Sequence, residues 1–210
     1  EDGIRDYKVT GVQTCALPIC VDKEIVGAIR QAAESLAQQG AKVDFNARPD
    51  FDVERNRINY GLLLSAAIGS GMPDAVFDMA QDLVAEADPA DMSNAIVQLR
   101  GIALSHKRWL KENERRLKIR AAWSRFFEDY DVLFCPCAFT TAFPHDHEPD
   151  MHQRRIEVNG ESRLYTDALW WAGLTINAYL PATAVPIGRS KDGLPIGMQV
   201  AGPYLGDMKT

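Results

Sequence analysis

The chain has 210 residues, of which 46% are hydrophobic and 25% are charged, so it can bury one domain-sized core and does not have the composition of a disordered protein. Its formal net charge is −6 with no basic stripe, which argues against a nucleic-acid partner, and no apolar run reaches the length of about 18 residues that a membrane span needs. Its 4 cysteines are too sparse for a disulfide scaffold, so a reducing cytoplasm is the expected location.

The first segment, residues 1–19, has neither a lasting hydrophobic period nor the charge order of a signal peptide. Read back into codons, residues 1–6 and 9–19 resemble the two halves of an indexed adapter used in short-read DNA libraries, with two index codons between them. We therefore predict that residues 1–19 are adapter-derived, that Cys15 carries no chemistry, and that the native domain, residues 20–210, began further upstream. A natural flexible tail is the alternative interpretation.

The next segment indicates a helix followed by a strand. Apolar residues recur at helical spacing from Ile25 to Ala37, Asp22 can cap the start of this helix, and Gly40 stands where a helix commonly ends. Residues 41–45 then favour a short strand. A helix, a glycine turn and a strand in this order are typical of α/β proteins.

The middle of the chain is predicted to be rich in helices. We expect helices over residues 52–68, from Pro73 to residue 87, and over residues 93–130 with a break near Ser105. Asp88-Pro89 has the pattern of a helix N-cap followed by proline at the first helical position. The last of these helices is expected to bury the apolar side chains of Leu117, Ala121, Trp123, Phe126 and Phe127.

The final third of the chain changes to strand patterns. The continuous apolar run over residues 131–136 predicts a strand buried on both faces. Asn159-Gly160 predicts a tight hairpin within residues 156–165, and residues 165–179 favour a helix. The segments ATAVPIG and LPIGMQVAG around the turn at residues 189–193 predict a terminal antiparallel hairpin.

Three groups of residues invite a chemical interpretation. The first group consists of Cys135, Cys137, His145, His147 and His152. Thiolates and imidazoles are ligands that zinc prefers, but the Cys-Pro-Cys spacing is not that of a zinc knuckle. We therefore interpret this group as two thiols at a strand end and a histidine-bearing surface loop. Ser70, between two glycines, resembles a nucleophile turn, but no strand precedes it and a helix stop is favoured. Trp170 and Trp171 point to different faces of a helix, so one is expected in the core while the other can line an apolar substrate pocket.

Residues 180–207, LPATAVPIGRSKDGLPIGMQVAGPYLGD, resemble the C-terminal segment of the amidase signature family. That family typically shows a Pro-Ala…Pro-x-Gly strand, a short turn, then Gly-Leu-Pro-x-Gly-x-Gln and Gly-Pro. Two further stretches match in order: YDVLFCPCAFTTAFPHD is similar to the strand and the Ala-Phe-Pro loop of the family, and INAYLPA is similar to the helix end before the last hairpin. Residues 22–45 resemble the helix-then-strand unit of the family.

The resemblance implies a fold of the α/β class: the C-terminal portion of an α/β/α sandwich with a mixed sheet, a helix-rich middle and a terminal antiparallel hairpin. It implies a serine hydrolase that cleaves carboxamide C–N bonds by a Ser-Ser-Lys mechanism, takes a small-molecule amide, and needs no cofactor or metal. The family's lysine and its glycine- and serine-rich nucleophile loop have no counterpart in this sequence, so no catalytic residue is assigned and the isolated chain is expected to be inactive. The side chains expected to wall the substrate cleft are Cys137, Phe139, Thr140, Trp170 and Trp171.

Three alternatives stay open at this point. One is a component of an amidotransferase that forms amides on aminoacyl-tRNA, which would need partner subunits. The second is a small metal-binding module around His145–His152, and the third is a noncatalytic helical interaction protein. A sheet that lacks its upstream strands would also expose strand edges, which predicts poor stability for the isolated chain.

Overall fold

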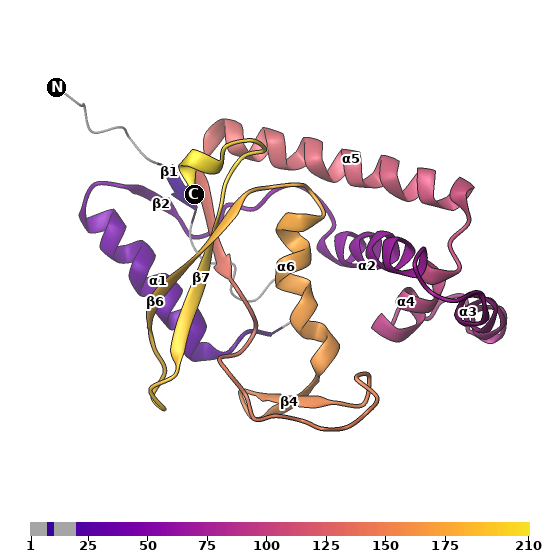
Figure 1. The fold of residues 1–210 in the computed structure, drawn as a ribbon. Coiled ribbons are helices and arrows are strands. Elements are labelled where there is room, and N and C mark those ends of the chain that lie inside the picture. Colours follow the sequence, from indigo (N-terminus) through magenta and orange to yellow (C-terminus); the bar gives the residue numbers. More distant parts are fainter. Residues whose placement is uncertain (1–7, 11–19) are drawn as a thin grey trace. The chain divides into compact units, whose positions relative to one another are not determined.

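The computed structural model describes residues 8–10 and 20–210, and it divides the chain into two compact units (Figure 1). The first unit takes in the chain up to Phe51 together with Arg120–Thr210, and it holds all of the described strands. The second unit, Asp52–Ile119, is helical. None of the described helices has the length and apolar character that a membrane crossing requires.

Five strands of the first unit form one mixed sheet: β1 (Lys8–Thr10), β2 (Lys42–Asp44), β3 (Val132–Pro136), β6 (Ala182–Arg189) and β7 (Pro195–Ala201). Their order across the sheet is β2-β1-β3-β7-β6. Strand β1 pairs in parallel with β2 and with β3, whereas β3 with β7 and β7 with β6 are antiparallel. The predicted mixed sheet with a terminal antiparallel hairpin is therefore confirmed.

Strand β3 lies at the centre of this sheet, and all 5 of its residues are buried. Such uninterrupted burial requires cover on both faces, as its apolar sequence predicts. Helix α1 (Lys23–Gln38) supplies part of that cover, because it packs against β2, β3, β6 and β7. The buried side chains of α1 are Ile25, Ile29 and Ala33, which recur at the spacing of one helix face.

Both ends of α1 are closed as the sequence predicts. The Asp22 carboxylate accepts a hydrogen bond from the Glu24 N–H at 2.8 Å, which satisfies one of the unpaired amides of the first turn. At the other end Gly40 has a φ of +100°, and its N–H donates to the carbonyl of Ala37. The N–H of Ala41 donates to the carbonyl of Leu36, so the helix ends in a Schellman motif, in which glycine is favoured at the left-handed position.

The structure includes Lys8–Thr10 in the fold, although these residues belong to the segment 1–19 that we predicted to be adapter-derived. They form β1, which lies between β2 and β3. The facing edges of those two strands present backbone N–H and C=O groups, and an extended segment between them satisfies both edges whatever its side chains are. Val9 is buried there. Cys15 lies outside the described residues.

The predicted hairpin at Asn159-Gly160 is confirmed. Strands β4 (Arg155–Val158) and β5 (Glu161–Leu164) are antiparallel, and the two turn residues have φ values of 55° and 82°, as a type I′ turn requires. The Asn159 side chain also accepts a hydrogen bond from the Lys23 N–H and donates one to the Val21 carbonyl, both at 3.0 Å. This amide therefore fastens the hairpin to the start of α1.

A short 3₁₀ turn, η1 (Tyr165–Ala168), follows the hairpin and leads into α6 (Leu169–Ile176), where we predicted one helix over residues 165–179. The chain after α6 runs into β6 and β7, and it ends in a second 3₁₀ turn, η2 (Asp207–Lys209).

The second unit consists of α2 (Val53–Gly69), α3 (Asp74–Glu86), α4 (Asn94–Ile102) and the first part of α5 (His106–Asp129). The break between α4 and α5 confirms the interruption predicted near Ser105. The buried apolar cluster of the second unit is formed by Ile58, Leu62 and Val97. Helices α2 and α4 approach closely because Gly101 has no side chain, and a Cβ there would lie 2.4 Å from the Cβ of Ser65.

Two details predicted for the helical middle are wrong. Asp88-Pro89 does not begin a helix: the Asp88 carboxylate accepts from the Ala90 N–H at 2.8 Å in a turn, and the helix begins only at Asn94. This local hydrogen bond competes with helix formation. Leu117 is 49% exposed and Ala121 is also exposed, because the buried face of α5 runs through neighbouring residues such as Ala122 and Ile119.

Candidate functional site

The first part of the predicted cleft wall follows the end of β3, where Pro136 is the last strand residue. Cys137 and Thr140 are partly exposed there, whereas Phe139 is fully buried. The carbonyl of Phe139 accepts the Asp22 N–H at 2.8 Å, so the backbone of this loop is fixed to the N-cap residue of α1. Of these three residues, Cys137 and Thr140 are the ones that reach the surface.

The second part of the predicted wall is α6. Trp170 and Trp171 are 5% and 0% exposed, and their rings pack edge to face with centroids 4.9 Å apart. Both indole N–H groups are buried without a hydrogen-bond partner among the described residues. We expected one of the two rings in the core, and the structure buries both of them.

Gln199 joins these two parts of the wall. Its side-chain amide is buried and donates to the Pro136 carbonyl at 2.8 Å and to the Trp171 carbonyl at 3.3 Å. In the β3–β7 register Gln199 lies opposite Cys135, so one side chain of β7 holds both the end of β3 and α6. No role for Gln199 was predicted from the residues, and its place at the end of the Gly-Leu-Pro-x-Gly-x-Gln motif is the signal that could have pointed to it.

Burial favours the neutral form of the two thiols in this region, Cys135 and Cys137. Cys135 is fully buried, and its pKa is raised far above the ordinary value, mainly by desolvation and further by neighbouring Cys137. Burial also raises the pKa of Cys137, which is half-buried. Because the thiolate is the nucleophilic and metal-binding form, both side chains stay as neutral thiols at neutral pH.

The histidines of the loop after β3 do not come together with these thiols. His145 and His147 are exposed and stack on each other with ring centroids 6.1 Å apart, while His152 is partly exposed. Within residues 8–10 and 20–210, no three or more His, Cys, Asp or Glu side chains are placed to hold a metal ion together. The described residues therefore give no support to a metal-binding module around His145–His152.

Ser70 acts as a helix stop, as the sequence favours. Helix α2 ends at Gly69, and the Ser70 hydroxyl donates to the Ala67 carbonyl at 2.7 Å. The hydroxyl is thus engaged with the last turn of its own helix, on an exposed corner of the second unit. This geometry is that of a terminating residue, and no nucleophilic role is assigned to it.

Comparison with known proteins decides the family. The model of the family described as amidase matches residues 6–210. The chain belongs to the amidase family. The resemblance drawn from the C-terminal motifs is therefore confirmed, and the match extends through the helical middle as well as the final hairpin.

Curated relatives of this amidase-family chain include components of glutamyl-tRNA(Gln) amidotransferases. The chain is 28% identical to one such amidotransferase subunit from Clostridium acetobutylicum over 231 residues, which cover 100% of this chain and 45% of the relative. It is 34% identical to the corresponding subunit from Halothermothrix orenii over 101 residues, 48% of this chain and 19% of the relative. The chain thus spans less than half the length of these relatives.

Solved structures share the fold. A bacterial aryl acylamidase of the amidase signature family has a TM-score of 0.69 at 19% identity, covering 99% of this chain and 42% of that one. Another amidase has a TM-score of 0.67 at 18% identity, covering 99% of this chain and 44% of that one. At these identities the likeness shows a common fold, and it confirms the predicted fold class.

Proposed function

We propose that this chain forms the C-terminal part of an enzyme that hydrolyses carboxamide C–N bonds of a small-molecule substrate. The observation that carries the proposal is the amidase-family match over residues 6–210. The fold shared with amidases over 99% of the chain supports it as well. The three free thiols among the described cysteines support a reducing compartment, and we place the enzyme in the cytoplasm.

The mechanism proposed for the whole enzyme is that of the Ser-Ser-Lys hydrolases. A serine attacks the amide carbon, a second serine relays its proton to a lysine, and backbone N–H groups hold the oxyanion. In this proposal none of these groups lies in residues 20–210. The chain instead supplies a wall of the substrate cleft: Cys137 and Thr140 face the substrate, while buried Phe139, Trp170 and Trp171 support that wall.

The purified chain alone is accordingly expected to hydrolyse no amide. The measurement is release of ammonia from hexanamide and of p-nitroaniline from p-nitroacetanilide, at protein concentrations high enough to detect a single turnover. Any hydrolysis that copurifies with the chain would contradict the assignment of the catalytic residues to a different part of the enzyme. The decisive test is the coding DNA upstream in the same source, where we expect an in-frame lysine motif followed by a glycine- and serine-rich loop.

A second candidate function is favoured by the names of the curated relatives, which are amidotransferase subunits. In that case the enzyme would form an amide on aminoacyl-tRNA together with partner subunits. The net charge of −6 and the absence of a basic stripe in the sequence favour the simple amidase over this alternative. The two candidates separate by assay of the full-length enzyme: the amidase hydrolyses free amides without a partner, and the amidotransferase requires tRNA and all of its subunits.

A further inference from the structure

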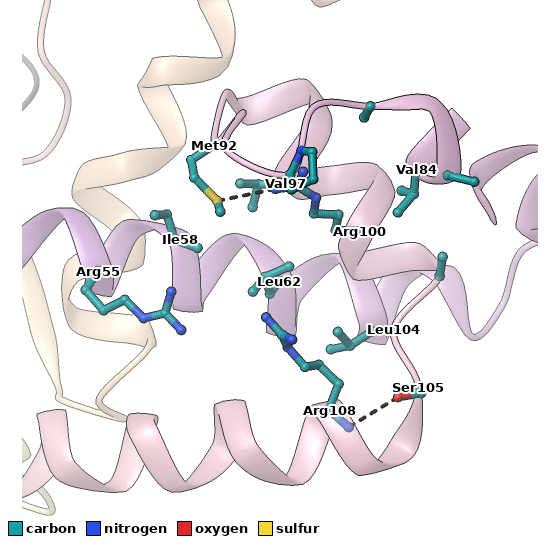
Figure 2. Close-up of a pocket in the computed structure, with 14 residues that line it drawn as sticks. Arg55, Ile58, Leu62, Val84, Met92, Val97, Arg100, Leu104, Ser105 and Arg108 are labelled. Carbon is teal, nitrogen blue, oxygen red and sulfur yellow. Dashed lines mark hydrogen bonds between the residues drawn. The ribbon is translucent and has the colours of Figure 1, made fainter. Parts of the chain in front are cut away.

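A pocket of about 500 Å³ lies within the second unit, bounded by α2, the turn after α3, α4 and the start of α5 (Figure 2). This volume is in the range that holds a small organic ligand. One part of its lining is apolar, formed by Ile58, Leu62, Val84, Val97 and Leu104. The lining also contains 3 arginines and no aspartate or glutamate: Arg55, Arg100 and Arg108. The pocket therefore combines an apolar floor with an excess of positive charge.

The positive charge is held in place by Glu112, which is fully buried beside the pocket. Arg55 donates to its carboxylate at 3.2 Å, Arg108 lies 3.7 Å from it, and Arg115 pairs with it as well. One carboxylate thus faces three guanidinium groups, which leaves a net positive charge around it. The buried side-chain amide of Asn59 donates to the same carboxylate at 3.0 Å and fixes its orientation.

Arg55 and Arg108 retain donor capacity toward the pocket. A guanidinium carries five N–H donors, and Arg55 reaches Glu112 through its Nη2 whereas Arg108 approaches it through its Nε. Figure 2 shows the Arg108 side chain rising from α5 toward Leu62, while the Arg55 side chain extends from the start of α2 into the space between α2 and α5. Arg55 and Arg108 each have a nitrogen near the same Glu112 oxygen, at 3.2 and 3.7 Å, and both line the pocket, so the two guanidinium groups are close enough together to hold one carboxylate.

Arg100 has a different part in the pocket, because its guanidinium is engaged with the chain. It donates to the carbonyls of Asp88 and Asp91 at 2.7 and 2.6 Å, and to the sulfur of Met92 at 3.4 Å. These bonds hold the turn between α3 and α4 as one wall of the pocket. Arg100 is thus a positioning residue, and the charged group of the ligand is bound by Arg55 and Arg108.

The geometry points to a binding site for an organic anion: a carboxylate held by Arg55 and Arg108, with an apolar body against Ile58, Leu62 and Val97. The site is independent of the proposed amide hydrolysis, since it involves no bond-making step and lies within the second unit alone. An organic carboxylate is preferred to a bare inorganic anion because much of the space beside the arginines is bounded by hydrocarbon, whose burial adds affinity.

The test is isothermal titration calorimetry of the full chain with naphthalene-2-carboxylate, and with naphthalene-2-methanol as the uncharged match. The acid is expected to bind with 1:1 stoichiometry, at least about tenfold tighter than the alcohol, and more weakly as salt is raised. Equal affinity for the acid and the alcohol, or no binding of either, would overturn the proposal.

Two arginines provide a matched pair of variants. Arg108→Gln is expected to weaken binding of the acid about tenfold, because it removes one charged donor from the pocket. Arg115→Gln removes a partner of the same Glu112 carboxylate, but Arg115 does not line the pocket. The affinity of this variant for the acid should therefore stay within about twofold of wild type. An equal loss of affinity for the acid in both variants would mean that Glu112 and its arginine partners act only on stability, and the proposed site would be rejected.

A third variant tests the apolar half without touching any arginine. Val84 lines the pocket from α3 and is partly exposed, so Val84→Trp can fill the space while the helix is retained. Binding of the acid should then fall below detection with an unchanged circular dichroism spectrum. Undiminished binding in this variant would place the anion elsewhere on the surface and overturn the assignment.

Discussion

Replacing Gln199 with methionine is expected to destabilise the first unit by about 2 kcal/mol, because the change removes both side-chain donors while keeping side-chain length. The bond to the Pro136 carbonyl is short, at 2.8 Å, and it is buried. Its loss removes about 1 kcal/mol of net hydrogen bonding and leaves a buried carbonyl without this donor, which costs about another 1 kcal/mol. The bond to Trp171 is longer, at 3.3 Å, and contributes less.

Urea unfolding followed by tryptophan fluorescence measures this loss directly. The Trp171 carbonyl accepts a hydrogen bond from the Gln199 amide, and the buried Trp170 ring packs against that of Trp171, so both indoles report on the region that the substitution weakens. With a slope of about 2 kcal/mol per molar urea, the midpoint should fall by about 1 M. The amide hydrolysis assay is not needed, so this result is independent of the proposed function.

The matched control is Gln39→Met. Gln39 is exposed in the same unit, and its side-chain amide also donates to a backbone carbonyl, that of Ser35 at 3.3 Å. Because water can replace that bond, the control should stay within about 0.5 kcal/mol of wild type. If Gln199→Met and Gln39→Met had the same midpoint, the two carbonyls would not depend on Gln199, and the reasoning that joins β3 to α6 through this side chain would be refuted.

Three further changes are expected to act elsewhere in the chain. Gly101→Ala places a Cβ 2.4 Å from a side chain of α2, so it should lower the free energy of unfolding of the second unit by an amount on the order of 1–3 kcal/mol. Far-UV circular dichroism should show this unit melting at a lower temperature, and an unchanged melting temperature would contradict the close helix contact. Asp22→Ala removes the cap of α1 and should cost about 1 kcal/mol in thermal unfolding, with Asp22→Asn as the retained-cap control. The pKa of Asp44 is lowered, first by the Asn46 N–H and then by the Tyr130 hydroxyl, so its stabilising effect is present above the ordinary pKa of 3.8 and is lost as the pH falls through the lowered value. Asp44→Ala should therefore destabilise the chain at pH 7 and converge with wild type in acid, and a constant difference across that range would count against the assignment.

The elements that the sequence predicts well are those set by local chemistry. The limits of α1 follow from a carboxylate before its first turn and from Gly40, which takes the left-handed position after its last turn. The hairpin at Asn159-Gly160 follows from two residues that tolerate positive φ, and the burial of β3 follows from its unbroken apolar run. In each case the deciding atoms lie within a few residues of one another.

The features that escaped prediction depend on partners far along the chain. Gln199 is 63 residues from Pro136, and nothing in its own neighbourhood shows that its amide satisfies that carbonyl. Leu117 and Ala121 were expected on the buried face of α5, but the helix pattern alone does not fix which neighbouring stripe meets the core. The position of Trp170 and Trp171 on one short helix predicted opposite faces, and both faces are covered.

The strand at Lys8–Thr10 shows that backbone pairing can place a segment in a sheet even where the surrounding sequence has no lasting hydrophobic period. The codon interpretation of residues 1–19 concerns how those residues were encoded, whereas β1 is held by backbone pairing with Val43 on one side and Val132 on the other. Backbone hydrogen bonds do not depend on side-chain identity, and Val9 supplies a described side chain that is buried and β-branched, as a central strand favours. Lys8–Thr10 can therefore lie between β2 and β3 because this segment is extended and its described side chain, Val9, is apolar and buried.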